Sequence, residues 1–199
     1  MSTATRRRLG IPGFPTAPWG EHVCVFFKNK EQLLSLVVPF IQAGLEDNEF
    51  CMWITADPIT EKEAFQALEK AVPHAHEYLA GKQLEILPYK QWYLPSGYFD
   101  AQICLDMWVG KARYTEKKGL DGIRITGNPV WLRSEEDWTK FGHYERSVHN
   151  RIQNERVIAL CTYPIDRCTC DNLLSTLTAH SSALMLESDQ WRRIDLNLQ

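Results

Sequence analysis

Three cysteines lie close together in the stretch ALCTYPIDRCTC, and a histidine and another cysteine share an earlier apolar segment. His22 and Cys24 are separated by one residue, so in a strand both side chains lie on one face. Histidine nitrogens and cysteine thiolates are donors that zinc prefers. One hypothesis is therefore a metal-binding or redox-switch site formed by His22, Cys24, Cys168 and Cys170.

The spacing of these cysteines favours a simpler interpretation. Cys168 and Cys170 form C-x-C, whereas zinc knuckles and redox motifs use C-x-x-C. Cys161 lies inside the apolar run, as expected for a small buried core residue. The preferred prediction is a strand end followed by an exposed loop, with no metal and no cofactor.

The segment FFKNKEQLL follows the first apolar run, where a nucleotide-binding domain has a glycine-rich turn. No glycine lies between Gly20 and Gly44, so the bare backbone amides that hold a phosphate are missing. The chain also lacks the G-x-S-x-G turn of a serine hydrolase. We therefore expect a protein that does not hydrolyse ATP and is not an enzyme.

Apolar segments of strand length alternate with helical patterns along the chain. The predicted strands cover residues 22–27, 50–57, 84–89, 121–128, 157–163 and 181–188. The predicted helices cover residues 31–49, 60–72, 99–118, 134–152 and 171–180. Strands this uniformly apolar are covered on both faces. The predicted fold class is α/β, with three layers and a mainly parallel sheet flanked by helices.

Aromatic and polar residues gather where these strands end. The segment PYKQWYLPSGYF holds five aromatic residues in twelve, a density typical of a hydrophobic plug or a pocket lid. Ligands of open α/β sheets bind beyond the carboxyl ends of the strands, and this mixture of groups suits a small, mostly apolar molecule. The predicted ligand-binding residues are Asp57, Tyr89, Trp92, Tyr93, Asn128, Trp131 and Tyr163.

Length and composition fit one ordinary domain. The chain has 199 residues and a net charge of -3, which gives no reason to expect direct binding of nucleic acid. No segment approaches the roughly 18 apolar residues of a membrane span, and no signal peptide follows Arg6-Arg7-Arg8, so a cytoplasmic protein without membrane contact is expected. We predict a flexible tail over residues 1–16, one domain over 17–192 and a C-terminal tail over 193–199.

Five segments give the chain a family resemblance over roughly residues 17–187. They are PWGEHVCVFF, LVVPFIQAGLEDNEFCMWIT, LEILPYKQWYLPSGYFD, DGIRITGNPVWL and VIALCTYPIDRC. Together they resemble the MEDS domain, a sensory domain of methanogens, methylotrophs and dichloromethane-responsive regulators. The resemblance implies a RecA/KaiC-like core without a phosphate loop, and it implies sensing of small, often hydrocarbon-like molecules. Phe26-Phe27 departs from the family's usual Phe-Tyr and removes a hydroxyl.

The leading hypothesis is a non-enzymatic sensory domain that binds a small organic ligand. Family members are usually joined to a histidine kinase or a DNA-binding helix-turn-helix, and neither follows within these 199 residues. We therefore expect output through a separate signalling protein, either a histidine kinase or a transcription regulator, or through a homodimer surface. The alternatives are the metal-binding or redox-switch protein above and a degenerate ATPase-like adaptor module.

Overall fold

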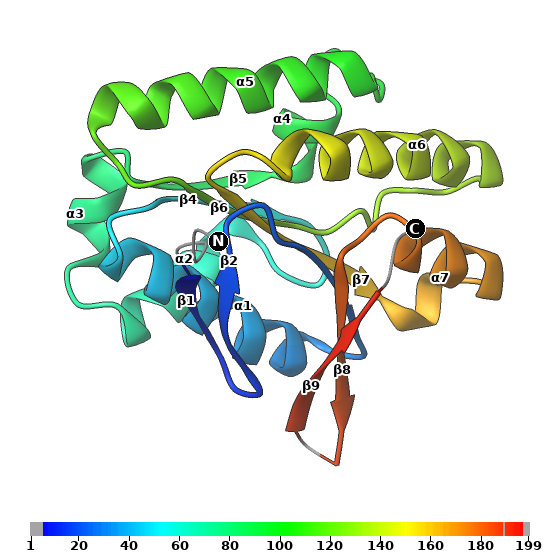
Figure 1. Cartoon of the computed structure of the whole chain (residues 1–199), viewed down its shortest axis with the longest axis horizontal. Coiled ribbons are helices and arrows are strands. Elements are labelled where there is room, and N and C mark those ends of the chain that lie inside the picture. The colour runs from blue at the N-terminus through cyan, green and yellow to red at the C-terminus, as the bar shows by residue number, and fades with distance from the viewer. Residues whose placement is uncertain (1–5, 189, 197–199) are drawn as a thin grey trace, which may run out of the picture.

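A computed structural model describes residues 6–188 and 190–196 and shows a seven-stranded sheet between layers of helices (Figure 1). The strands lie in the order β5 (Leu84–Pro88), β4 (Phe50–Thr55), β6 (Ile123–Gly127), β7 (Val157–Pro164), β3 (His22–Phe27), β8 (Ser182–Glu187) and β9 (Gln190–Asp195). All neighbours are parallel except β8 and β9. The predicted α/β class with a mainly parallel sheet is confirmed.

Helices cover both faces of this sheet (Figure 1). On one face lie α1 (Lys30–Glu46), α2 (Glu61–Ala71) and α3 (Ala75–Ala80). On the other face lie α4 (Tyr89–Tyr93), α5 (Ala101–Lys118) and α6 (Glu135–Ile152), and α7 (Cys170–Leu177) lies beside α6. The short 3-10 helix η1 (Ile165–Arg167) precedes α7 in the chain. The capping boxes predicted at Thr60 and Ser134 are both present, so local side-chain hydrogen bonds start α2 and α6.

The predicted N-terminal tail is instead a β-hairpin that packs on α1. Its strands β1 (Arg6–Ile11) and β2 (Phe14–Pro18) pair antiparallel, and Leu9, Ile11 and Phe14 are buried. The prediction of a flexible tail over residues 1–16 is therefore wrong for residues 6–16, and residues 1–5 lie outside the described part of the chain. Apolar side chains cover α1 here, and burial of that surface outweighs the polar composition of the segment.

Charge also holds this hairpin in place. Arg8 Nη2 lies 2.6 Å from Asp47 Oδ1 and 3.3 Å from Glu46 Oε2, at the end of α1.

At Gly10 the backbone approaches α1 so closely that an added Cβ would lie 2.2 Å from the Pro39 carbonyl oxygen. Only glycine fits at this position.

The predicted C-terminal tail is also partly a strand. Residues 193–195 belong to β9, and Trp191 in the same strand is 6% exposed. The prediction of a tail over 193–199 is therefore wrong for residues 193–195, because pairing with β8 orders the segment. Residues 197–199 lie outside the described residues.

Beneath α1 the sheet buries a complete ion pair. Arg124 in β6 is fully buried, and its Nε and Nη2 donate to the Glu49 carboxylate at 2.7 and 3.1 Å. Its Nη1 donates to the Phe40 carbonyl at 2.9 Å. Arg7 from the hairpin donates to the same carboxylate at 2.8 Å. The network ties the hairpin, α1 and the sheet together.

Candidate functional site

Three of the predicted ligand residues form an aromatic cluster under α6. The ring of Trp131 lies 5.6 Å from that of Tyr93 and stacks on that of Tyr89 at 6.5 Å. Phe99 and Phe141 complete the cluster, at 5.3 and 5.8 Å from Trp131. These rings pack against one another, so they close one end of the core rather than surround a ligand.

The other predicted residues do not join this cluster around a common cavity. Trp92 is 2% exposed and meets Trp108 of α5 edge-on, at 5.9 Å between ring centroids. Asn128 donates to the Asp57 carbonyl at 3.0 Å and accepts from Val130 N at 3.0 Å, so its amide shapes a turn. The side chain of Asp57 is exposed.

Tyr163 lies in a different part of the same core. Its ring is 5.7 Å from that of Phe26 and 6.0 Å from that of His180. Burial raises the pKa of its hydroxyl well above the ordinary value, so the group stays protonated. The structure brings Tyr89, Tyr93 and Trp131 together and places the other four residues elsewhere, so their role in ligand binding stays a prediction.

An apolar cavity of about 370 Å³ lies beside them, at the carboxyl ends of β3 and β8 and against α7. Its lining is mostly aliphatic, with one lysine in the turn after β3 and one glutamine in the first turn of α1. The lining residues are Phe26, Lys28, Gln32, Ile165, Leu173, Leu177, Ala183, Met185 and Leu186. The sequence shows that Leu173 and Leu177 share one face of a helix. It does not predict the cavity, because only the pairing of β3 with β8 brings α7 against the ends of these strands.

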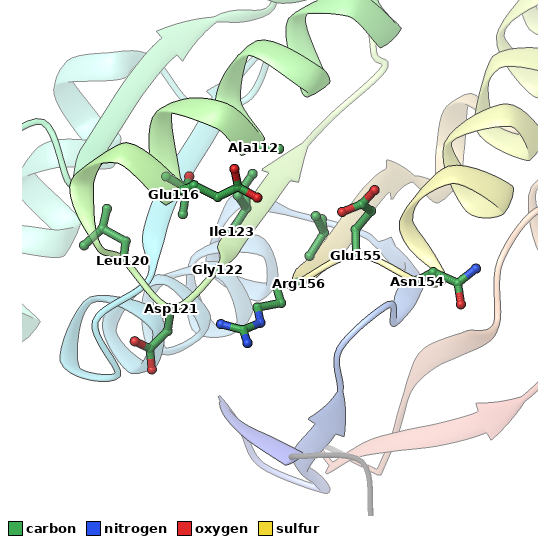
Figure 2. A pocket seen from close by; sticks show the side chains of 11 residues that line it. Ala112, Glu116, Leu120, Asp121, Gly122, Ile123, Asn154, Glu155 and Arg156 are labelled. Atoms are coloured by element: carbon green, nitrogen blue, oxygen red, sulfur yellow. The ribbon is translucent and has the colours of Figure 1, made fainter. Parts of the chain in front are cut away.

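A second recess, of about 460 Å³, lies at the opposite ends of β6 and β7 (Figure 2). Figure 2 shows the charged side chains of Glu116, Asp121, Glu155 and Arg156 around it. Ligands of open α/β sheets bind at carboxyl ends, and charged groups disfavour an apolar ligand. The apolar cavity is therefore the better candidate for the ligand site.

A buried polar cluster lies under α6, and we name it the His–Glu–Cys cluster. Its members are His22, Glu145, Cys161 and His180, with donor atoms all within 4.8 Å of one another. His22 and His180 are fully buried and Glu145 is 4% exposed. Burial and the neighbouring His180 lower the pKa of His22 to about 4, so this imidazole is neutral at neutral pH.

The cluster differs from the alternative metal set that the sequence offered beside the preferred prediction of no metal. His22 belongs to it, but Cys24 Sγ is buried 3.7 Å from the Ser182 carbonyl. Cys168 Sγ lies 3.4 Å from the Pro164 carbonyl, and Cys170 is exposed. Cys161, expected to be a simple core residue, is half-buried in the cluster instead.

One signal in the sequence pointed to the missed carboxylate. Phe141, Val148 and Ile152 recur at helical spacing on the buried face of α6. Glu145 occupies the same stripe, where a charged residue is rarely buried without a partner. Its partners could not be found in this way, because they come from β3, β7 and the segment before β8.

The sheet order and the covering helices define a RecA-like α/β protein, and comparisons with known proteins agree. A KaiC-like protein of the hyperthermophilic archaeon Pyrococcus horikoshii OT3 matches with a TM-score of 0.61 at 14% identity. The match covers 96% of this chain and 86% of that chain, and at this identity it shows the fold alone.

The family is shown by sequence. The model of the MEDS domain, the "MEthanogen/methylotroph, DcmR Sensory domain", matches residues 21–181. The chain belongs to the MEDS family, as its resemblance predicted. A comparison with curated proteins found no match. Within residues 6–188 and 190–196, no helix has the length and apolar character needed to span a membrane.

Proposed function

We propose that the chain is a non-enzymatic sensory domain whose apolar cavity binds a small, mostly apolar organic molecule. The observation that carries this proposal is the cavity itself. Its volume of about 370 Å³ is that of a small-molecule site, and aliphatic side chains form most of its wall. Lys28 and Gln32 supply the few polar groups that would orient a ligand. Membership of the MEDS family supports the sensory role.

The start of α1 supports a role without nucleotide hydrolysis. β3 ends at Phe27 and α1 begins at Lys30, so only Lys28 and Asn29 separate them. Asn29 is used as the helix cap, and its side chain accepts from Gln32 N at 2.9 Å. A turn this short leaves little backbone to surround a phosphate chain.

The cavity also offers a route for the signal. Its wall includes Leu173 and Leu177 of α7, and on the outer side of the same helix Leu174 is 61% exposed. Met185 in β8 lines the cavity and is 51% exposed. A ligand that shifts α7 would alter this apolar surface, which we propose as the contact with a separate histidine kinase, a transcription regulator or a second copy of the chain.

Methyl NMR tests the ligand site directly. Protein labelled at Leu and Met methyl groups is titrated with short alcohols, ketones and chlorinated methanes. We expect at least one of these probes to give saturable shifts at Leu173, Leu177 and Met185, with a dissociation constant below about 1 mM, or about -4 kcal/mol. Leu177→Trp, which fills the cavity, should abolish the shifts.

Leu174→Trp is the matched control, because it adds the same ring to the exposed side of the same helix. This variant should bind as the wild-type chain does. Equal responses of the two variants, or no saturable shift with any probe class, would contradict the proposal.

A further inference from the structure

The His–Glu–Cys cluster brings together side chains from four separate parts of the fold. His22 begins β3, Glu145 lies in α6, Cys161 lies in β7 and His180 precedes β8. The pairing of β3 with β7 and β8 places them together, although His22 and Cys161 are 139 residues apart in sequence. Four donors that converge from four segments require explanation, because burial of polar groups is unfavourable without partners.

Four of the donor separations are close to those of a tetrahedral metal site. Glu145 Oε2 lies 3.2 Å from His22 Nε2 and 3.3 Å from His180 Nε2. Cys161 Sγ lies 3.4 Å from His22 Nε2 and 3.7 Å from Glu145 Oε2. Zinc bonds of about 2.0–2.1 Å to nitrogen and oxygen and about 2.3 Å to sulfur give a tetrahedron with edges of about 3.3–3.6 Å. Four of the six donor separations lie at 3.2–3.7 Å, close to these edges, and all six lie within 4.8 Å.

The hydrogen bonds of the two histidines aim their free nitrogens at the same point. His22 Nδ1 lies 3.1 Å from the Ala179 carbonyl, and His180 Nδ1 lies 2.7 Å from the Thr176 carbonyl. A carbonyl oxygen only accepts, so each Nδ1 carries a proton and each Nε2 faces the centre of the cluster. Backbone carbonyls orient metal-binding histidines in the same manner.

The cluster has a surplus of acceptors when both imidazoles are neutral. With both imidazoles neutral, as zinc binding requires, two Nε2 lone pairs would face a carboxylate that only accepts, and the Cys161 thiol would offer a single proton. His180 Nε2 lies 3.3 Å from Glu145 Oε2, yet this buried nitrogen makes no hydrogen bond. A cation at the centre would satisfy all four atoms at once.

We propose that His22, Glu145, Cys161 and His180 bind one zinc ion. Two imidazole nitrogens, a carboxylate oxygen and a thiolate form a closed set of four donors of the types that zinc prefers. The carboxylate and the thiolate carry two negative charges, so the loaded site is neutral, which lowers the cost of its burial. With no open position, the ion holds β3, β7, α6 and the α7–β8 connection together.

The wild-type chain supplies the first test. The protein is purified without an affinity tag or chelator and its metal content is measured. Zn²⁺ alone is then titrated into metal-free protein. We expect about one zinc per chain and a rise in the melting temperature on loading. Co²⁺ substituted for zinc should show the visible bands of tetrahedral cobalt and a thiolate-to-cobalt charge-transfer band in the near ultraviolet.

Two cysteine variants then locate the site. Cys161→Ser should abolish the charge-transfer band and weaken zinc binding by about tenfold or more. Cys168→Ser is the control, since its sulfur belongs to the set predicted from the sequence and lies outside the cluster. It should keep both the band and the affinity. Far-ultraviolet circular dichroism checks that each variant is folded.

The zinc content and the cobalt spectrum of the wild-type chain test the proposal even if Cys161→Ser does not fold. Absence of stoichiometric zinc, together with no cobalt charge-transfer band, overturns the proposal. Zinc binding that is kept in Cys161→Ser but lost in Cys168→Ser would overturn the proposal and assign the metal to the other cysteines. The ligand titration above is independent of either result, because its readout lies at the methyl groups of the apolar cavity.

Discussion

Glu49 and Glu145 are buried on opposite faces of the sheet, and the two carboxylates have opposite surroundings. Glu49, on the α1 face, accepts three hydrogen bonds from the guanidinium groups of Arg124 and Arg7. Asp121 lies 3.3 Å from Arg7, so two acids balance two arginines. Glu145, on the α6 face, is surrounded by imidazole nitrogens and a thiol.

Burial alone does not define the role of a carboxylate. The donors around it do. Glu49 meets groups that are always charged and only donate, so its site is complete as a structural ion pair. Glu145 meets two imidazole nitrogens and a thiol, and the proposed zinc ion would complete its site.

The largest effect is expected at the completed ion pair. Arg124→Met leaves the Glu49 carboxylate buried with Arg7 as its remaining partner, and this should lower the free energy of unfolding by about 3–5 kcal/mol. Urea denaturation measures the loss. Arg8→Met is the control, because Arg8 is more than half exposed and its ion pairs contribute at most about 1 kcal/mol. Equal losses would show that the buried pair is not special.

A somewhat smaller loss is expected in the aromatic cluster on the α6 face. Trp131→Ala removes a ring that contacts Tyr93, Phe99 and Phe141 and should cost about 3 kcal/mol in unfolding free energy. Tyr98→Ala, at a side chain that is 62% exposed, should change stability by less than about 0.5 kcal/mol. If Trp131→Ala costs no more than this control, the ring lines a space and is not part of the packed core.

The two glutamates can be compared by the same isosteric change. In zinc-free buffer, Glu49→Gln should cost about 1.5–3 kcal/mol, since it weakens hydrogen bonds to charged groups. Glu145→Gln should cost less than about 1 kcal/mol, because an amide N–H can donate to an imidazole nitrogen. Urea denaturation with and without zinc measures both. Zinc should stabilise the wild-type chain and Glu49→Gln, and it should stabilise Glu145→Gln much less. Equal costs without zinc would mean that Glu145 already has adequate donors.

The smallest effect is expected at an exposed carboxylate, Glu63. Its hydrogen bond from Lys30, and then those at Thr60, lower its pKa from 4.5 to about 2. A lowered pKa stabilises the fold above about pH 4.5, and this contribution is lost as the pH falls through about 2. The difference in unfolding free energy between the wild-type chain and Glu63→Gln should therefore be constant above pH 5 and disappear near pH 2. Salt should reduce it. A difference unchanged at pH 2 would contradict the ionic origin.

Local patterns in the sequence predicted most of the sheet and its helices. The apolar runs predicted β3, β4, β5, β6, β7 and β8, and the capping boxes at Thr60 and Ser134 marked the starts of α2 and α6. These signals work because capping bonds and helical periodicity involve residues within a few positions of one another. The family segments predicted the RecA-like core and the MEDS family, and both are confirmed.

The tertiary structure decided which side chains meet. The N-terminal hairpin and β9 are ordered by contacts with α1 and β8, so their own composition did not reveal them. The aromatic residues at the strand ends were identified, but whether they enclose a ligand or fill the core depends on how their rings pack. His22, Glu145, Cys161 and His180 became neighbours only because β3 lies between β7 and β8, and Arg124 met Glu49 only because β6 lies beside β4. Strand order is set by the summed burial and pairing of the whole sheet, and no local segment contains that information.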